Sequence, residues 1–138
     1  YKLRSMIRSA PDAGAIAAQV GDMRVTPLGK FLRRFRIDEL PQFYNVLVGD
    51  MSIVGPRPEQ LELARAYASR WPQFGTRTTL RPGITGWAQV RGRYAADEAE
   101  TKDKLSYDLY YLKHASFVVD LSILFQTLKT LVTGNSAR

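Results

Sequence analysis

The stretch TPLGKFLRRFRIDELPQFYNVLV (residues 26–48) carries the clearest structural pattern in this chain, two helical repeats separated by a pair of acids. A threonine followed by proline is a helix start signal. The apolar residues after it recur at i, i+3, i+4 and i+7, the spacing of one helical face: Leu28, Phe31, Leu32 and Phe35. We predict a first helix over residues 27–36. On structural grounds alone it would be a core helix with its basic side chains in solvent, but the acids that follow it leave a functional role open. The same spacing predicts a second helix over residues 39–48.

Two adjacent carboxylates, Asp38 and Glu39, lie in the most basic part of the sequence. Five cations and no acid occur between Arg24 and Arg36, so neighbouring positive charges should keep both carboxylates ionised. A basic pocket that contains a carboxylate suits a nucleophile or a metal ligand that meets a polyanionic substrate. The structural alternative is that Asp38 is the N-cap of the second helix, a common role that requires nothing of Glu39.

The composition is that of one globular domain: 138 residues, 45% hydrophobic and 24% charged. The absence of cysteine excludes disulfides and thiolate metal sites. The single histidine, His114, excludes a histidine-rich zinc site. A net charge of +7 indicates an acidic partner: nucleic acid, an anionic membrane or a phosphorylated substrate. No uninterrupted apolar run reaches the roughly 18 residues that a membrane-spanning helix needs.

Further elements follow along the chain. Residues 51–54 have the pattern of a short strand, and helical patterns occupy three later segments: 59–71, 97–113 and 117–132. The last of these is mostly apolar and is either a core helix or one that lies in a membrane interface.

Prolines on both sides of Arg57 fix its backbone in an extended form. Residues 75–94 are rich in glycine and arginine, which predicts a loop whose backbone approaches a ligand closely.

Three motifs in this order resemble the bacterial sugar transferases, the monotopic phosphoglycosyl transferases: DELPQ (38–42), VGDMSIVGPRP (48–58) and RPGITGWAQV (81–90). The resemblance runs from Tyr1 to about Gly134, nearly the whole chain. It implies a single catalytic domain over residues 1–138, of the α/β class and mostly helical with a few short strands.

The resemblance also implies an activity. The family transfers a sugar 1-phosphate from a nucleotide diphosphate sugar, usually a UDP-sugar, to a membrane polyprenyl phosphate, which starts exopolysaccharide, O-antigen or related glycan synthesis. Asp38 would be the nucleophile, forming a phosphosugar–aspartate intermediate that the polyprenyl phosphate then attacks. Glu39 would hold Mg²⁺, the implied cofactor. The implied location is the cytoplasmic face of the bacterial inner membrane.

Four cations match phosphate-binding residues of the family: Lys2, Arg33, Arg57 and Arg93. A guanidinium presents a planar fork that fits phosphate oxygens better than an ammonium does. Lys2 lies in an N-terminal segment with the alternation of a strand.

Family members carry a basic segment and a hydrophobic re-entrant membrane helix before the residues that match Tyr1. Neither occurs here, and the chain begins without methionine. We therefore expect a C-terminal fragment of a longer membrane-associated protein. The basic helix 27–36 and the apolar helix 117–132 are the candidates for contact with the membrane surface.

Two other functions fit parts of the sequence. A nucleic-acid-binding module would use the net charge of +7 and the interleaved aromatic residues. It has no recognised motif here and gives the acid pair no role, so we expect no nucleic-acid partner. A non-catalytic scaffold of a glycan-assembly complex would keep Asp38 as a helix cap. Asp38→Asn separates the scaffold from the enzyme, because a cap tolerates asparagine and a nucleophile does not.

Overall fold

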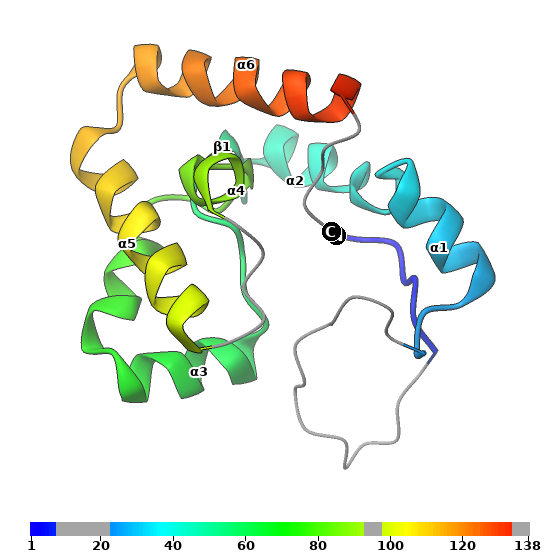
Figure 1. The fold of residues 1–138 in the computed structure, drawn as a ribbon, viewed down its shortest axis with the longest axis horizontal. Helices are drawn as coiled ribbons and strands as arrows, with labels where there is room; N and C mark the ends of the chain where they lie inside the picture. Colours follow the sequence, from blue (N-terminus) through cyan, green and yellow to red (C-terminus); the bar gives the residue numbers. More distant parts are fainter. Residues whose placement is uncertain (8–22, 93–97, 134–138) are drawn as a thin grey trace.

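The computed structural model describes residues 1–7, 23–92 and 98–133 (Figure 1). Within these ranges the fold is mostly helical with one small sheet, which confirms the predicted α/β class. The α-helices are α1 (Pro27–Arg34), α2 (Gln42–Val48), α3 (Leu61–Arg70), α4 (Trp87–Arg91), α5 (Glu98–His114) and α6 (Phe117–Thr133). The 3₁₀ helices are η1 (Ile37–Glu39) and η2 (Pro72–Thr79), and the strands are β1 (Ser52–Val54) and β2 (Gly83–Thr85).

The two strands are parallel, with Ser52 opposite Gly83 and Val54 opposite Thr85. Parallel strands need a crossover connection, and here α3 and η2 supply it. A Cβ atom on Gly83 would lie 2.1 Å from the backbone nitrogen of Gly55, so only glycine permits the two backbone segments to approach this closely. The sheet thereby fixes the backbone that leads from β1 into the Pro-Arg-Pro segment.

The main cluster of buried apolar side chains joins three elements: Val54, Tyr111 and Ile123. Partly buried apolar residues pack around them: Leu80, Trp87, Val90, Val119 and Leu124. The Tyr111 hydroxyl donates to Oδ1 of Asp120 at 2.7 Å, which joins α5 to α6. As Figure 1 shows, α6 lies across β1 and α4.

The N-terminal segment runs along α1 toward the acid pair. The Thr26 side chain caps α1 by accepting from the Gly29 amide at 2.9 Å, and the Thr26 amide donates to the Ser5 carbonyl at 3.1 Å. A Cβ on Gly29 would lie 1.9 Å from that carbonyl oxygen, so glycine is needed here as well. The Leu3 amide then donates to the Asp38 carbonyl at 3.0 Å. Residues before α1 therefore reach the turn that follows it.

The second predicted helix begins later than its sequence pattern indicates. α2 starts at Gln42, with Pro41 in the N-cap position, so the prediction that Asp38 caps this helix is wrong. Arg36 has a left-handed backbone with φ 56° and ψ 18°. That conformation ends the path of α1 and directs the acids into the separate turn η1.

The apolar face of α1 is another correction. Its residues Leu28, Phe31 and Phe35 are 66%, 53% and 57% exposed, so the structural alternative of a core helix is wrong for this face. The helix itself is confirmed, and its end lies within two residues of the predicted one. α1 therefore presents both apolar and basic side chains on its surface.

The segment predicted as a loop over 75–94 contains most of η2 together with β2 and α4 in its described part. Two of its glycines permit close packing: Gly83 between β1 and β2, and Gly86 at the start of α4, where a Cβ would lie 2.2 Å from the Gly55 carbonyl oxygen. The strand predicted over 51–54 and the three later helices are confirmed, with helix ends within two residues of the predicted ones.

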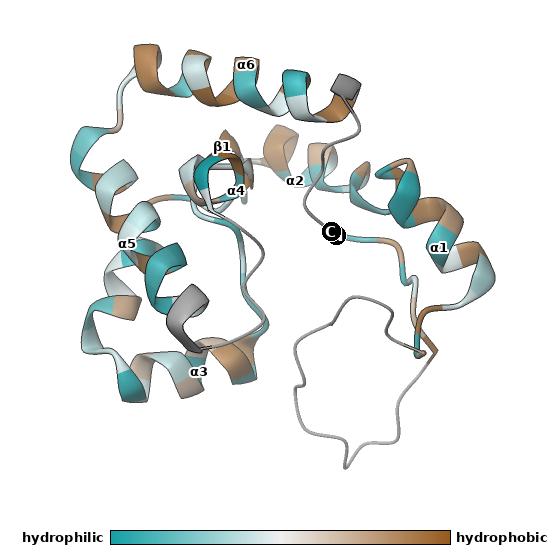
Figure 2. Cartoon of the chain, in the orientation of Figure 1, coloured by the Kyte–Doolittle hydropathy of each residue, from teal (hydrophilic) through white to brown (hydrophobic). Residues whose placement is uncertain are grey.

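α6 has two different faces, and the reading as a core helix holds for one of them. Ile123 is completely buried, whereas Phe117 and Phe125 are 81% and 72% exposed. Figure 2 shows hydrophobic residues along α6 and along α1. Among the helices that the structure describes, none is long and apolar enough to cross a membrane.

Candidate active site

The acid pair lies in η1, between α1 and α2. Asp38 is 2% exposed and Glu39 is partly buried, with a side chain that is 12% exposed. The left-handed Arg36 that precedes η1 and the Leu3 amide that binds the Asp38 carbonyl hold this turn in place. Backbone geometry therefore directs two adjacent carboxylates into the interior of the molecule.

Three cations from three different segments approach the carboxylates. Lys2 Nζ lies 3.4 Å from Oδ2 of Asp38 and 3.3 Å from Oε1 of Glu39. Arg57 Nη2 donates to Oε1 of Glu39 at 2.5 Å, and Arg36 Nη1 lies 3.7 Å from Oε2 of the same side chain. Lys2, Asp38, Glu39 and Arg57 are thus brought together, although 55 residues of sequence separate the first from the last.

These contacts control the charge of Glu39. Burial alone would raise the pKa of its carboxyl, but the positive charges of Arg57, Lys2 and Arg36, with the hydrogen bond from Arg57, outweigh that effect and lower the pKa below its ordinary value of 4.5. Glu39 is therefore an anion over the whole physiological pH range.

The other two predicted phosphate-binding residues are Arg33 and Arg93, and the structure describes only the first of them. Nε of Arg33 donates to the hydroxyl of Ser5 at 2.8 Å, and within the described residues Arg33 forms no ion pair with Asp38 or Glu39. Ser5 is itself buried. Arg33 therefore ties the N-terminal segment to α1, which supports the position of Lys2. Arg93 lies outside the described residues.

The acid pair fits a magnesium ion that is shared with a substrate. No group of three or more histidine, cysteine, aspartate or glutamate side chains occurs in the described ranges, so they hold no site made of such ligands alone. Mg²⁺ is commonly held by one or two carboxylates together with substrate phosphates and water. Asp38 and Glu39 supply the carboxylates, and the cations that now occupy them are the groups that phosphates would attract.

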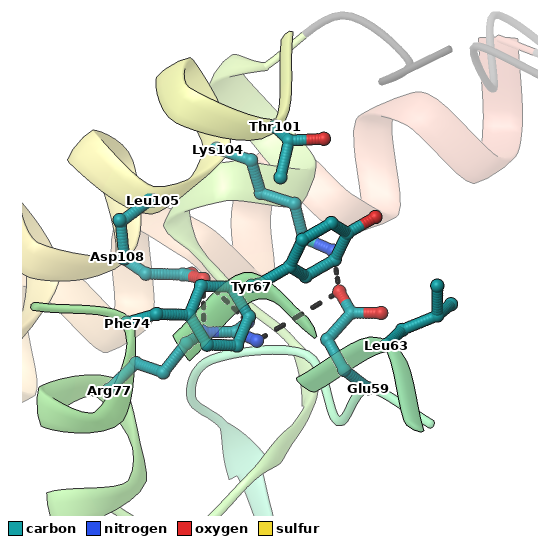
Figure 3. A pocket seen from close by; sticks show the side chains of 9 residues that line it. All are labelled: Glu59, Leu63, Tyr67, Phe74, Arg77, Thr101, Lys104, Leu105 and Asp108. Atoms are coloured by element: carbon teal, nitrogen blue, oxygen red, sulfur yellow. Dashed lines mark hydrogen bonds and ion pairs between the residues drawn. The ribbon is translucent and has the colours of Figure 1, made fainter. Parts of the chain in front are cut away.

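Sequence reasoning missed a second charged cluster, which lines a cavity of about 90 Å³ between α3, η2 and α5 (Figure 3). Arg77 and Asp108 form a buried ion pair there, and Glu59 and Lys104 form another. The partners are 31 and 45 residues apart. No local spacing in the sequence could have paired them.

Sequence reasoning also missed the place of Arg36 beside Glu39. Arg36 belongs to the basic stretch before the acids. Its left-handed backbone turns it toward Glu39, and an arginine in the sequence gives no indication of such a backbone.

Comparison with known proteins gives a consistent result. The family model described as bacterial sugar transferase matches residues 1–134. The chain is 51% identical, over its full length, to a UDP-N-acetylgalactosamine-undecaprenyl-phosphate N-acetylgalactosaminephosphotransferase of Aeromonas hydrophila, and covers 33% of that protein. It is 41% identical to a UDP-glucose:undecaprenyl-phosphate glucose-1-phosphate transferase of Caulobacter vibrioides, with 99% of this chain and 52% of that protein covered.

A third relative is matched over most of its own length. The exopolysaccharide production protein PSS of Rhizobium leguminosarum bv. phaseoli is 40% identical, with 96% of this chain and 70% of the relative covered. The chain therefore spans about a third to two thirds of the relatives named here. The match of the family model and these identities establish that the chain belongs to the bacterial sugar transferase family.

Proposed function

We propose that this chain is the catalytic part of an enzyme that transfers a sugar 1-phosphate from a UDP-sugar to a membrane polyprenyl phosphate. The observation that carries the proposal is the meeting of Lys2, Arg36 and Arg57 on two adjacent buried carboxylates. The relatives from Aeromonas hydrophila and Caulobacter vibrioides are named for the same reaction class, with undecaprenyl phosphate as acceptor and two different sugars as cargo.

Asp38 is the proposed nucleophile. A carboxylate oxygen of Asp38 forms a bond to the phosphorus that bears the sugar, and the bond from that phosphorus to the bridging oxygen breaks, so that uridine monophosphate leaves. An oxygen of the polyprenyl phosphate then attacks the same phosphorus and displaces the Asp38 carboxylate. Two displacements replace one difficult step, as in other covalent mechanisms.

The cations around the acids prepare the site for phosphate. Two anions must approach each other in this reaction, so their charge has to be neutralised before a bond can form. Lys2 has a side chain that is 43% exposed, whereas that of Asp38 is 3% exposed. Lys2 can therefore turn from the carboxylates to an incoming diphosphate, which uncovers Asp38. Arg57, with its side chain 30% exposed, can likewise turn from Oε1 of Glu39 to a phosphate.

Glu39, with Asp38 beside it, would hold Mg²⁺. When bound, the ion supplies positive charge at the phosphate oxygens and favours departure of the nucleoside monophosphate. Glu39 suits this role because its pKa is lowered and its carboxylate stays ionised. Arg33 and Arg93 remain proposed phosphate ligands on the family pattern alone.

The acceptor lipid requires that the site lie beside a membrane, and we propose the cytoplasmic surface of the bacterial inner membrane. Large apolar side chains are exposed on α1, α2 and α6, among them Leu28, Phe31, Phe43, Leu47 and Phe125. The exposed cations Lys30 and Arg34 lie on α1. This combination is typical of surfaces that enter the interface of an anionic leaflet.

The reaction is tested with the full-length, membrane-anchored protein, undecaprenyl phosphate, Mg²⁺ and a panel of UDP-sugars. We expect uridine monophosphate and a lipid-linked sugar diphosphate with at least one donor, and neither product with Asp38→Asn. Asp50→Asn, at an exposed aspartate beyond α2, is the matched control and should retain the activity. Full activity of Asp38→Asn would contradict the proposal and favour a structural role of the acid pair.

A further inference from the structure

A buried ion pair joins η2 to α5 next to the Pro-Arg-Pro segment of the active site. Arg77 of η2 is 5% exposed and Asp108 of α5 is 1% exposed. Nε and Nη2 of Arg77 both donate to Oδ2 of Asp108, at 3.0 Å and 2.6 Å. A buried ion pair of this kind contributes little net stability, because both charges lose their hydration. Its geometry therefore points to a positional role.

The same guanidinium reaches the backbone of an active-site residue. Nη2 of Arg77 also donates to the carbonyl oxygen of Arg57, at 2.8 Å. Arg57 in turn donates to Oε1 of Glu39 at 2.5 Å. A continuous series of contacts thus runs from Asp108 through Arg77 and Arg57 to the acid pair.

Other restraints also act on the Pro56–Pro58 segment that carries Arg57. The Pro56 carbonyl accepts from the Gly83 amide at 2.9 Å, and the prolines at 56 and 58 fix the adjacent backbone angles. The Arg57 carbonyl oxygen accepts a hydrogen bond from the Arg77 guanidinium. Loss of that donor would leave the Arg57 carbonyl without this hydrogen bond and would remove one restraint on the backbone that carries the Arg57 side chain.

The surroundings of Arg77 exclude direct contact with a substrate. Its guanidinium lies 4.8 Å from the ring centre of Phe74, and Nη1 lies 3.9 Å from Oε1 of Glu59. Lys104 forms an ion pair with the same Glu59 oxygen. Figure 3 shows these side chains directed toward one another across the cavity. Arg77 can therefore act on the reaction only through the residue whose backbone it holds.

We propose that Arg77 and Asp108 are positioning residues that hold Arg57 in the orientation needed at the phosphate site. The proposal rests on the proposed function for the role of Arg57, and on the three contacts above for the link to it. It adds to the site two buried residues that do not touch the substrate.

The test is a double-mutant cycle on the full-length protein, with initial rates of lipid-linked sugar formation as the readout. Arg77→Lys keeps the positive charge, but a single ammonium cannot reproduce the forked contact with Asp108 and Arg57. We expect kcat/KM to fall by about 10- to 100-fold, the effect of a misplacement of about 1 Å. Asp108→Asn removes the charge that holds Arg77 without changing the shape of the side chain, and it should lower kcat/KM in the same way.

Coupling distinguishes positioning from general stability. In an Arg57→Ala background Arg77→Lys should reduce the rate by less than about twofold, because the residue it positions is gone. Thermal unfolding of each variant shows whether the fold is intact. Arg65→Lys, at an exposed arginine of α3, is the matched control and should have the wild-type rate.

The outcomes separate the two proposals. Full additivity with Arg57→Ala, or a wild-type rate in folded Arg77→Lys, overturns the positioning role and leaves the transferase intact. A wild-type rate in Arg57→Ala removes Arg57 from the phosphate site and overturns the positioning role with it. If the wild-type protein transfers nothing, crystal structures decide: a displaced Arg57 side chain in Arg77→Lys supports positioning, and an unchanged contact with Glu39 overturns it.

Discussion

The two neighbouring acids of η1 have different surroundings, which suits them to different tasks. The Asp38 carboxylate forms an ion pair with Lys2, at 3.4 Å. The Glu39 carboxylate is approached by three cations, the nearest of them at 2.5 Å. A carboxylate paired with one half-exposed lysine can be uncovered to form a bond, whereas one held by several cations is better suited to hold a metal ion. The difference supports Asp38 as nucleophile and Glu39 as ligand.

Glu39 predicts how stability depends on pH. Its pKa in the folded protein is lower than the ordinary 4.5 of an unfolded chain, so its contribution is complete above that value. The contribution is lost as the pH falls through the folded pKa. We expect Glu39→Gln to have a lower melting temperature than the wild type at about pH 7. On acidification to about pH 4, the melting temperature of Glu39→Gln should fall by less than that of the wild type.

The measurement is thermal unfolding by circular dichroism in the presence of EDTA, so that no metal ion contributes. Glu62→Gln, at an exposed glutamate of α3, is the matched control and should follow the wild-type pH dependence. If the melting temperature of Glu39→Gln fell on acidification as much as that of the wild type, the assigned ion pairs would be contradicted.

Among the secondary-structure elements, the parallel strand pair is the most sensitive to a small change. Gly83→Ala would place a methyl group 2.1 Å from the Gly55 nitrogen. We expect it to reduce the free energy of unfolding by about 1 to 3 kcal/mol or more, as overpacking does, and to move Arg57 with the end of β1. Gly75→Ala, whose methyl group would meet nothing within 4 Å, is the control. Urea titration compares the two, and equal midpoints would contradict this account of the sheet.

The two faces of α6 predict two different effects of substitution. Ile123→Ala, at a side chain with 0% exposure, should reduce the free energy of unfolding by about 2 to 5 kcal/mol. Phe125→Gln, at a side chain that is 72% exposed, should leave the urea midpoint nearly unchanged and weaken binding to vesicles. A large loss of stability in Phe125→Gln would show that this face packs inside the protein.

Helices with a strong repeat were predictable from the sequence, and their surroundings were not. The period of α1 is correct, but the repeat cannot distinguish burial in a core from exposure at a surface, and Phe31 is 53% exposed. Asp38 had the residue type of a helix cap, yet the left-handed backbone of Arg36 placed it in a separate turn. Tertiary contacts decided both cases.

The acids and Arg57 of the candidate site were predictable because short motifs carry them. Lys2 could be assigned only through the family resemblance, since its approach to Asp38 depends on how the N-terminal segment follows α1. The pairing of Arg77 with Asp108 could not be predicted, because the two are 31 residues apart on different elements. Long-range contacts of this kind are fixed by packing.

At the scale of the whole molecule, exposed apolar and basic residues predict binding to anionic membranes. Lys30→Gln with Arg34→Gln should reduce partitioning onto phosphatidylserine vesicles, since each cation near the surface contributes about 1 kcal/mol. Lys102→Gln with Lys113→Gln removes the same charge from exposed positions of α5 and should have a smaller effect. Sedimentation with vesicles measures both pairs, and equal reductions would show that only net charge matters.

The central claim is that Asp38 forms a covalent bond with the transferred phosphosugar. Intact-protein mass spectrometry tests it directly, with the full-length protein mixed with Mg²⁺ and each UDP-sugar in the absence of polyprenyl phosphate. We predict a mass gain equal to one sugar phosphate with the correct donor, and no gain in Asp38→Asn. The absence of any adduct from a protein that still transfers sugar phosphate to lipid, or an equal adduct in Asp38→Asn, would contradict the claim.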